Sequence, residues 1–210
     1  MKKLLSLPPN VVNKFHDITR LSREEYFCTC DPVGHKLGSG GGTAWIADCF
    51  GKAAAADRRQ SIDTDLPGKK IIIHGGGQSR RLPAYAPSGK LLTPIPIFRW
   101  ERGQRIDQCL LDLQLPLYEE ILQRAPQQLT TIIASGDVLL RATEPLQDIP
   151  EADVVCYGLW ATPQQISHHG VFMMRRDEPG RLDFMLQKPS TEQQATLMQT
   201  HFALIDVGVW

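Results

Sequence analysis

Short apolar runs alternate with amphipathic stretches along most of the chain. The β-branched run Ile71–Ile73 and the segment Thr130–Ala134 are typical of buried parallel strands. Leucine and isoleucine recur at helical spacing across Asp107–Arg124, which predicts a helix. The same patterns predict helices or strands in further segments: strands at 26–30, 153–157 and 203–210, a hairpin from 171–174 and 182–186, and helices at 9–20, 44–56 and 192–199. Residues 91–98, interrupted by two prolines, are expected to be extended. The alternation predicts an α/β fold, a three-layer sandwich around a mostly parallel, Rossmann-like sheet.

The composition narrows the class of protein. The chain has 210 residues, of which 42% are hydrophobic and 22% charged, and this suits one large domain spanning residues 1–210. Basic and acidic side chains balance, so the bulk charge indicates neither a nucleic-acid nor a membrane partner. An odd number of scattered cysteines and the lack of a membrane-length apolar run indicate reduced thiols and a cytoplasmic protein.

The most specific chemistry follows the Ile71–Ile73 strand. Glycines, two polar residues and three cations come in close succession: Gly75, Gly76, Gly77, Gln78, Ser79, Arg80, Arg81 and Lys90. Because glycine has no Cβ, the amides of such a loop can approach phosphate oxygens closely. Residues 75–105 hold six cationic side chains against one carboxylate. These features predict a polyphosphate site in which Arg81 and Lys90 neutralise charge. The structural alternative is a tight turn with solvated arginines.

A second glycine cluster, residues 38–43, precedes the helix expected at 44–56. Gly38, Ser39 and Gly40 are candidate nucleotide-binding residues, because a glycine–serine run at a helix start resembles the phosphate loop of small-molecule kinases. The chain contains no Gly-Lys-Ser/Thr pattern, which argues against a P-loop. A second anion-facing loop, a kinase loop and a purely structural turn remain open.

The order of these motifs resembles the signature of sugar-nucleotide pyrophosphorylases, Gly-Gly-x-Gly/Ser-x-Arg-Leu ending in Pro-Lys. Ser79 replaces the last glycine of that signature, and Ser-Gly stands before Lys90 where proline is usual. More narrowly, nearly the whole chain resembles the bacterial bifunctional fucokinase/fucose-1-phosphate guanylyltransferase family, in segments 37–43, 74–90, 98–104, 134–137, 152–158, 168–172 and 182–190. That family continues into a sugar-kinase half. The chain is therefore expected to be an N-terminal fragment, truncated at its C-terminus and continuing into a missing region.

The resemblance implies transfer of GMP from GTP to fucose 1-phosphate, giving GDP-fucose and pyrophosphate. Arg81 and Lys90 would be catalytic. Asp137 lies in a Ser-Gly-Asp turn after a buried strand, where it would hold Mg²⁺ or, alternatively, cap the next segment. The resemblance assigns the sugar phosphate to Lys188, Gln187, Gly170 and Asp206, although Asp206 is equally well interpreted as a capped strand residue. Two other functions remain open: a sugar kinase, and a catalytically silent part of a larger bifunctional enzyme.

Overall fold

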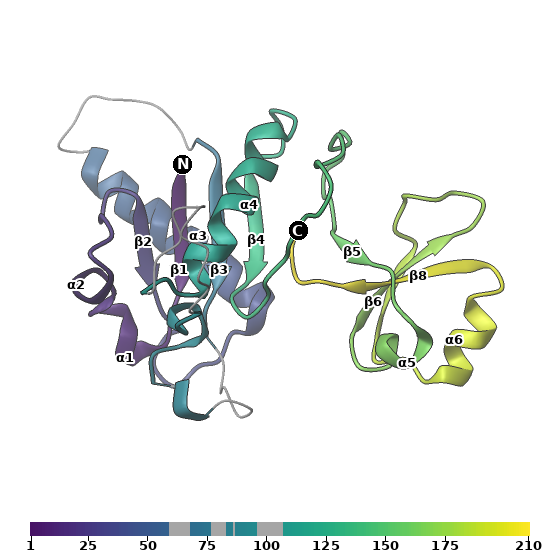
Figure 1. Cartoon of the computed structure of the whole chain (residues 1–210). Helices are drawn as coiled ribbons and strands as arrows, with labels where there is room; N and C mark the ends of the chain where they lie inside the picture. Colours follow the sequence, from purple (N-terminus) through teal and green to yellow (C-terminus); the bar gives the residue numbers. More distant parts are fainter. Residues whose placement is uncertain (59–67, 77–82, 86, 96–106) are drawn as a thin grey trace. The chain divides into compact units, whose positions relative to one another are not determined.

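The computed structural model describes residues 1–58, 68–76, 83–85, 87–95 and 107–210. The chain divides into two compact units, Met1–Asp153 and Val154–Trp210 (Figure 1). That both belong to a single nucleotidyltransferase domain stays a prediction.

The first unit is built on a four-stranded parallel sheet with the order β2-β1-β3-β4 (Figure 1). Its strands are β1 (Lys2–Ser6), β2 (Tyr26–Thr29), β3 (Lys70–His74) and β4 (Thr131–Ser135). Strand β2 pairs with one edge of β1, and β3 pairs with the other edge. The strand order therefore reverses between β1 and β3. Open α/β sheets bind ligands in the crevice at the carboxyl ends of the strands at such a point.

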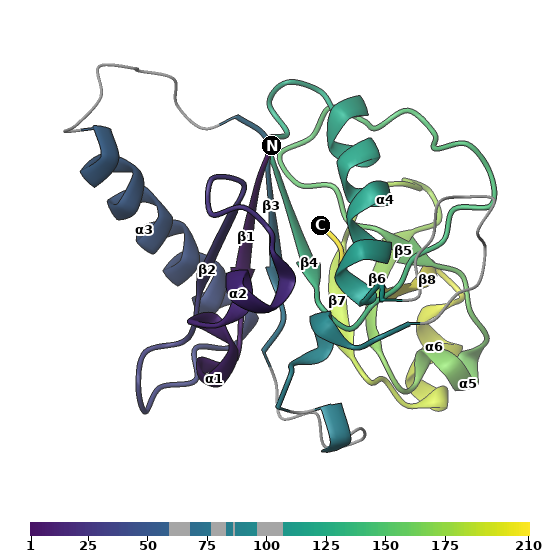
Figure 2. The ribbon, with the colours of Figure 1, turned by 60° about the vertical axis from the view of Figure 1, so that its left-hand side comes forward.

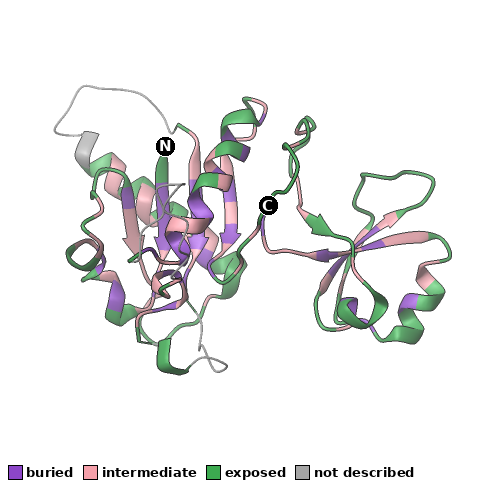
Figure 3. Ribbon diagram, viewed as in Figure 1, coloured by how far each residue is buried: buried purple, intermediate pink, exposed green. Residues whose placement is uncertain are grey.

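Two long helices cover the parallel sheet from opposite sides (Figure 2). Helix α3 (Gly38–Arg58) packs on one side, where Ile46 joins Leu4 and Ile72 in a buried cluster. Helix α4 (Leu110–Arg124) buries its own apolar stripe, including the fully enclosed Tyr118. Buried residues concentrate in the central strands (Figure 3). Shorter elements complete the unit: α1 (Pro9–Val12), α2 (Phe15–Thr19), and 3-10 helices η1 (Pro83–Tyr85) and η2 (Lys90–Leu92).

The second unit is an antiparallel sheet with the order β5-β8-β6-β7. Its strands are β5 (Gly158–Leu159), β6 (Gly170–Arg175), β7 (Phe184–Gln187) and β8 (His201–Asp206). Residues of β6 and β8 form a buried cluster with Ile166 of helix α5 (Pro163–Ile166), and Leu197 of helix α6 (Thr191–Leu197) packs against it. The predicted hairpin is confirmed as β6 and β7. The last strand, predicted at 203–210, is confirmed only in part, because β8 ends at Asp206.

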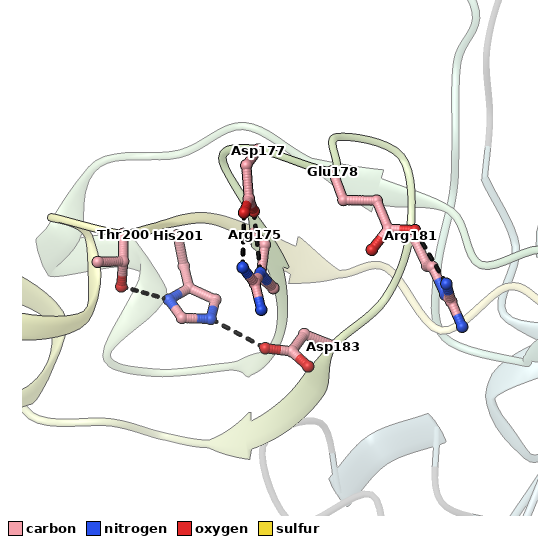
Figure 4. Close-up of polar contacts among 7 residues, drawn as sticks. All are labelled: Arg175, Asp177, Glu178, Arg181, Asp183, Thr200 and His201. Atoms are coloured by element: carbon pink, nitrogen blue, oxygen red, sulfur yellow. Dashed lines mark hydrogen bonds and ion pairs between the residues drawn. The ribbon is translucent and has the colours of Figure 1, made fainter.

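Polar contacts hold the β6–β7 connection (Figure 4). Arg175 binds Asp177 through two of its nitrogens, and Arg181 pairs with Glu178 at 2.9 Å. The His201 ring lies between the Thr200 hydroxyl, 2.8 Å from Nδ1, and the Asp183 carboxylate, 3.0 Å from Nε2 (Figure 4). The two arginine pairs are solvent-exposed, so each adds little to the stability of the fold.

Several predictions about local structure were wrong. Residues 38–43 are not a loop, because α3 already begins at Gly38. Strand β1 was missed altogether, and residues 153–157 form no strand, since pairing begins at Gly158. Residues 9–20 form two short helices instead of one. Residues 91 and 92, the first two of the segment expected to be extended, belong to the 3-10 helix η2. In α3, tertiary contacts override the low helix propensity of glycine: the His74 ring packs at Gly42, and Trp45 Nε1 donates to Cys30 O at 3.0 Å.

The broad class is confirmed: the protein is α/β, with a parallel sheet and an additional antiparallel sheet. All five cysteines are free thiols. Within the part of the chain that the structure describes, no helix is both long enough and apolar enough to cross a bilayer.

Candidate functional site

A pocket of about 810 Å³ opens at the carboxyl edge of the parallel sheet. All four strands contribute to its wall through the residues at or just beyond their ends: Ser6–Pro9 from β1, Cys30–Lys36 from β2, His74 and Gly76 from β3, and Ser135 and Asp137 from β4. Gly38, Ser39 and Lys90 complete the lining. The pocket therefore occupies the position where an open parallel sheet collects its ligands.

Lys90 and Asp137, two of the predicted site residues, meet in this pocket. The Lys90 ammonium group pairs with Asp137 Oδ2, and Ser135 Oγ donates to Asp137 Oδ1 at 2.6 Å. Burial alone would raise the pKa of Asp137, but the hydrogen bonds from Lys90 and Ser135 outweigh burial and lower the pKa. One cation and one ionised carboxylate are thus held together beside the β3 and β4 ends.

The glycines after β3 have different surroundings. Gly75 is buried, and a Cβ there would lie 2.6 Å from Leu91 Cδ1 and 3.2 Å from Leu7 Cδ2, so close packing requires a glycine. Gly76 is exposed and lines the pocket. The remaining predicted loop residues lie outside the described residues: Gly77, Gln78, Ser79, Arg80 and Arg81. Their roles, including catalysis by Arg81, stay predictions.

The second glycine cluster reaches the same pocket as the first turn of a helix. Gly38 and Ser39 line the pocket, and the first amides of a helix have no partner within the helix, which suits an anion. Gly40, in the same turn, is exposed. The Thr43 hydroxyl donates to Ser39 O at 2.9 Å and therefore accepts from His74 Nε2, 2.8 Å away. This contact fastens the start of α3 to the end of β3.

His74 lies at the centre of this arrangement. Burial lowers its pKa, and the charge of Asp31 opposes that shift without cancelling it. At Gly42 an added Cβ would lie 3.4 Å from His74 Cε1 and 3.8 Å from Asp31 Oδ1, so both side chains approach the helix there. The neutral imidazole of His74, the residue before the first glycine cluster, therefore contacts Thr43 at the end of the second cluster.

In the second unit, three of the predicted sugar-phosphate residues lie together. Gly170 pairs with Gln187 across β6 and β7, and a Cβ at position 170 would lie 3.3 Å from Gln187 Oε1 and 3.6 Å from Asp206 Oδ2. Burial raises the pKa of Asp206 despite the hydrogen bond from Gly208 N to its Oδ1 at 2.7 Å. Because Gly170 has no side chain, a space stays open between the Gln187 amide and the Asp206 carboxylate. We call this space, bounded by Gly170, Gln187 and Asp206, the cradle. Lys188 follows Gln187, exposed and with a positive φ of 51°, and its backbone N donates to His169 O.

Metal binding was predicted at Asp137. Among the described residues, no three histidine, cysteine or acidic side chains form a cluster able to hold a metal ion by themselves. A Mg²⁺ ion that takes most of its ligands from water and substrate phosphates does not need such a cluster. The metal role of Asp137 stays a prediction.

Sequence reasoning missed three parts of the pocket: the Ser6–Pro9 segment, the Cys30–Lys36 segment with Asp31, and His74. Ser6–Pro9 was missed because β1 was missed. The signal for Asp31 was available, since it directly follows the segment correctly predicted as β2. The reasoning that singled out Asp137, an acidic residue just beyond a buried strand, applies equally to Asp31.

Comparison with known proteins gives the family. Residues 65–207 match the fucose pyrophosphorylase domain. An L-fucokinase/L-fucose-1-P guanylyltransferase from Bacteroides fragilis is 57% identical across the whole of this chain. Fucose-1-phosphate guanylyltransferases from Mus musculus and Homo sapiens are 28% and 34% identical over 84% and 71% of the chain. The matches cover 22%, 29% and 23% of these relatives' own lengths. The domain match and the first relative together show that the chain belongs to the fucose pyrophosphorylase domain family.

Proposed function

We propose that the chain transfers GMP from GTP to fucose 1-phosphate, forming GDP-fucose and releasing pyrophosphate. The observation that carries the proposal is the pocket at the carboxyl edge of the parallel sheet, where Lys90 and Asp137 meet near Gly76. The pocket belongs to a chain of the fucose pyrophosphorylase domain family, and the relatives are named for guanylyl transfer to fucose 1-phosphate.

In the proposed reaction a phosphate oxygen of fucose 1-phosphate attacks the α-phosphorus of GTP. A P–O bond forms there while the bond from the α-phosphorus to the oxygen shared with the β-phosphorus breaks, and that electron pair leaves with pyrophosphate. The nucleophile arrives ionised, so the protein has to position the reactants and stabilise charge. Lys90 supplies a fixed cation in the pocket, and Arg81 is proposed to stabilise the charge that accumulates on pyrophosphate.

Asp137 fits a Mg²⁺ ion by the chemistry of its surroundings. Its carboxylate is kept ionised by Lys90 and Ser135 and lines a pocket open to substrate oxygens. A Mg²⁺ ion bound there would offset the negative charge of the triphosphate. Lys90 keeps the carboxylate ionised before substrate arrives and contributes its own charge to the phosphates.

The cradle of the second unit is proposed to hold fucose 1-phosphate. The Gln187 amide can donate to and accept from sugar hydroxyls, and the Asp206 carboxylate can accept from them. Gly170 keeps the space between the two side chains open, and Lys188 is proposed to pair with the phosphate.

The finer fold assignment belongs to the same proposal. The strand order of the parallel sheet, with its reversal between β1 and β3 and helices on both faces, supports a Rossmann-like three-layer type. A cytoplasmic location fits the five free thiols. A sugar-kinase function is not favoured, because the matched domain is a pyrophosphorylase domain.

Pyrophosphate release tests the proposal directly. The chain is incubated with Mg²⁺, fucose 1-phosphate and each of the four common nucleoside triphosphates in turn, with and without the sugar phosphate. We expect release with GTP that depends on fucose 1-phosphate and a product with the mass of GDP-fucose. Sugar phosphorylation without pyrophosphate would indicate a kinase, and no release with any triphosphate would contradict the proposal.

A further inference from the structure

The pocket in the first unit has two chemically different ends. At the β3–β4 end lie Lys90, Ser135 and Asp137, which suit phosphates and a metal ion. Beyond the ends of β1 and β2 the lining mixes apolar residues (Leu7, Pro8, Pro9, Pro32 and Val33) with polar ones, among them Asp31, His35 and Lys36. Flat apolar surfaces suit a planar base, with a few polar groups to fix its orientation.

The pocket is wide enough for a nucleotide to lie across the sheet. Neighbouring strands are roughly 4.8 Å apart, so the ends of β2 and β4, three strand positions apart, are separated by about 14 Å. With the triphosphate beside Lys90 and Asp137, the base of the same nucleotide extends toward β1 and β2. The residues just beyond β2 are then in position to recognise the base.

Asp31 is the acidic residue of the lining at that end. Its Oδ2 accepts from Leu37 N at 3.3 Å, and within the described part of the chain its Oδ1 has no hydrogen bond. Two carboxylate oxygens offer about four acceptor positions, so most of the accepting capacity of Asp31 is unused. Without a metal ion between them a carboxylate repels phosphate, so we take the ligand group that Asp31 meets to be a hydrogen-bond donor without negative charge.

We propose that Asp31 determines specificity for guanine by accepting hydrogen bonds from its N1–H and 2-amino groups. Guanine presents these two donors side by side, matching the two oxygens of a carboxylate. Adenine has an acceptor at N1, so Asp31 would be left facing it without a partner, which disfavours adenine. Lys36, on the same segment of the lining, carries a donor of the kind that guanine O6 accepts.

This inference rests on the proposed function in taking GTP as the nucleotide, and nucleotide exchange tests it by binding as well as by turnover. Affinities of the chain for GTP, ITP, XTP and 2′-deoxy-GTP are measured by titration calorimetry, in parallel with pyrophosphate release. Inosine lacks the 2-amino donor, and xanthine carries a carbonyl acceptor in its place. We expect GTP to bind the unmodified chain roughly 10- to 100-fold more tightly than ITP or XTP.

Asp31→Asn is the decisive variant. Its amide oxygen can still accept from Leu37 N, so the fold is expected to persist, as thermal unfolding would verify. Its amide N–H can donate to the xanthine carbonyl, so the binding preference should shift from GTP to XTP. The affinity for GTP should fall roughly 10- to 100-fold. A gain in XTP binding cannot arise from misfolding. Asp48→Asn, on the exposed side of α3, is the matched control and should leave the preference unchanged.

Other results separate the two proposals. If Asp31→Asn lowers the affinities for GTP, ITP and XTP equally and erases only the preference for GTP over 2′-deoxy-GTP, then Asp31 contacts ribose and the inference is overturned. Unchanged nucleotide preference overturns it as well. If the unmodified chain binds GTP selectively and the variant prefers XTP, but neither forms GDP-fucose, the inference stands and the proposed reaction fails.

Discussion

The Lys90 ammonium group binds the Asp137 carboxylate, although the two residues are 47 positions apart in the sequence. Lys90 begins the 3-10 helix η2, and Asp137 follows the end of β4. Their pairing shows that the segment after the glycine loop and the Ser-Gly-Asp turn contribute to one pocket. The charge of each side chain is held where a triphosphate and its metal ion are proposed to bind.

Replacing Lys90 with alanine should lower kcat/KM for pyrophosphate release by about 100- to 1,000-fold, because a preorganised charge is lost from the transition state. Steady-state kinetics at saturating Mg²⁺ measure the effect. Lys52→Ala removes an exposed cation of α3 and serves as the control, with activity expected to stay unchanged. Full activity of Lys90→Ala with an intact fold would remove Lys90 from the proposed mechanism.

Gly170→Ala should selectively weaken the binding of fucose 1-phosphate. The added Cβ would stand 3.3 Å from Gln187 Oε1 and 3.5 Å from Asp206 Cβ, so it fills the cradle between these side chains. We expect KM for fucose 1-phosphate to rise about 10-fold while the affinity for GTP is retained. Gly51→Ala, in α3 with open space at its Cβ position, is the matched glycine control. If the variant loses affinity for both substrates equally, the substitution has caused a folding defect and does not report on a sugar site.

His74 should make stability fall on acidification. Its pKa in the folded state lies below the ordinary value of 6.5, so the unfolded chain binds the proton first. Unfolding free energy is therefore lost as the pH falls below 6.5 toward the folded-state pKa, and is regained as the pH rises. Urea unfolding across this window should show a shallower pH slope in His74→Asn than in the unmodified chain.

Thr43→Val provides the comparison for this slope. It removes the hydroxyl that accepts from His74 Nε2 but leaves the imidazole in place. We expect a loss of about 1 kcal/mol in unfolding free energy with the pH slope retained. An unchanged slope in His74→Asn would show that another group titrates.

Tyr118→Phe should leave the protein as stable as before or stabilise it by up to about 1 kcal/mol. The ring is fully buried in α4, and its hydroxyl has no hydrogen-bond partner among the described residues. Burial raises the pKa of this phenol to about 12, as expected for a group kept from water. Urea denaturation measures the change, with Tyr26→Phe as a second buried tyrosine for comparison. A loss above 1 kcal/mol would reveal a partner for the Tyr118 hydroxyl.

Strong local patterns predicted individual elements well. The β-branched run at Ile71–Ile73 became β3, the leucine-rich stretch became α4, and the polar turn between two apolar runs became the β6–β7 hairpin. In each of these, the spacing of apolar side chains matches the face that the element buries.

The missed strand β1 shows where local patterns fail. From the sequence alone, Lys3 of β1 would be expected at the surface. The Lys3 side chain is in fact only 4% exposed, and it pairs with Glu25 and Glu119. Burial opposes the charged form of Lys3, but these two pairs outweigh burial and raise its pKa. A buried charge is tolerated only with partners of this kind, and they come from distant parts of the chain.

The sequence by itself determined the family, the α/β class, and the run of glycines and cations after β3, because these are properties of contiguous residues. Only the tertiary structure decided that Lys90 faces Asp137, that residues 38–43 begin a helix, and that Asp31 and His74 line the same pocket. The reason is geometric. Parallel strands bring their carboxyl ends to one edge of the sheet, so residues far apart in sequence meet there through a strand order that no local pattern encodes.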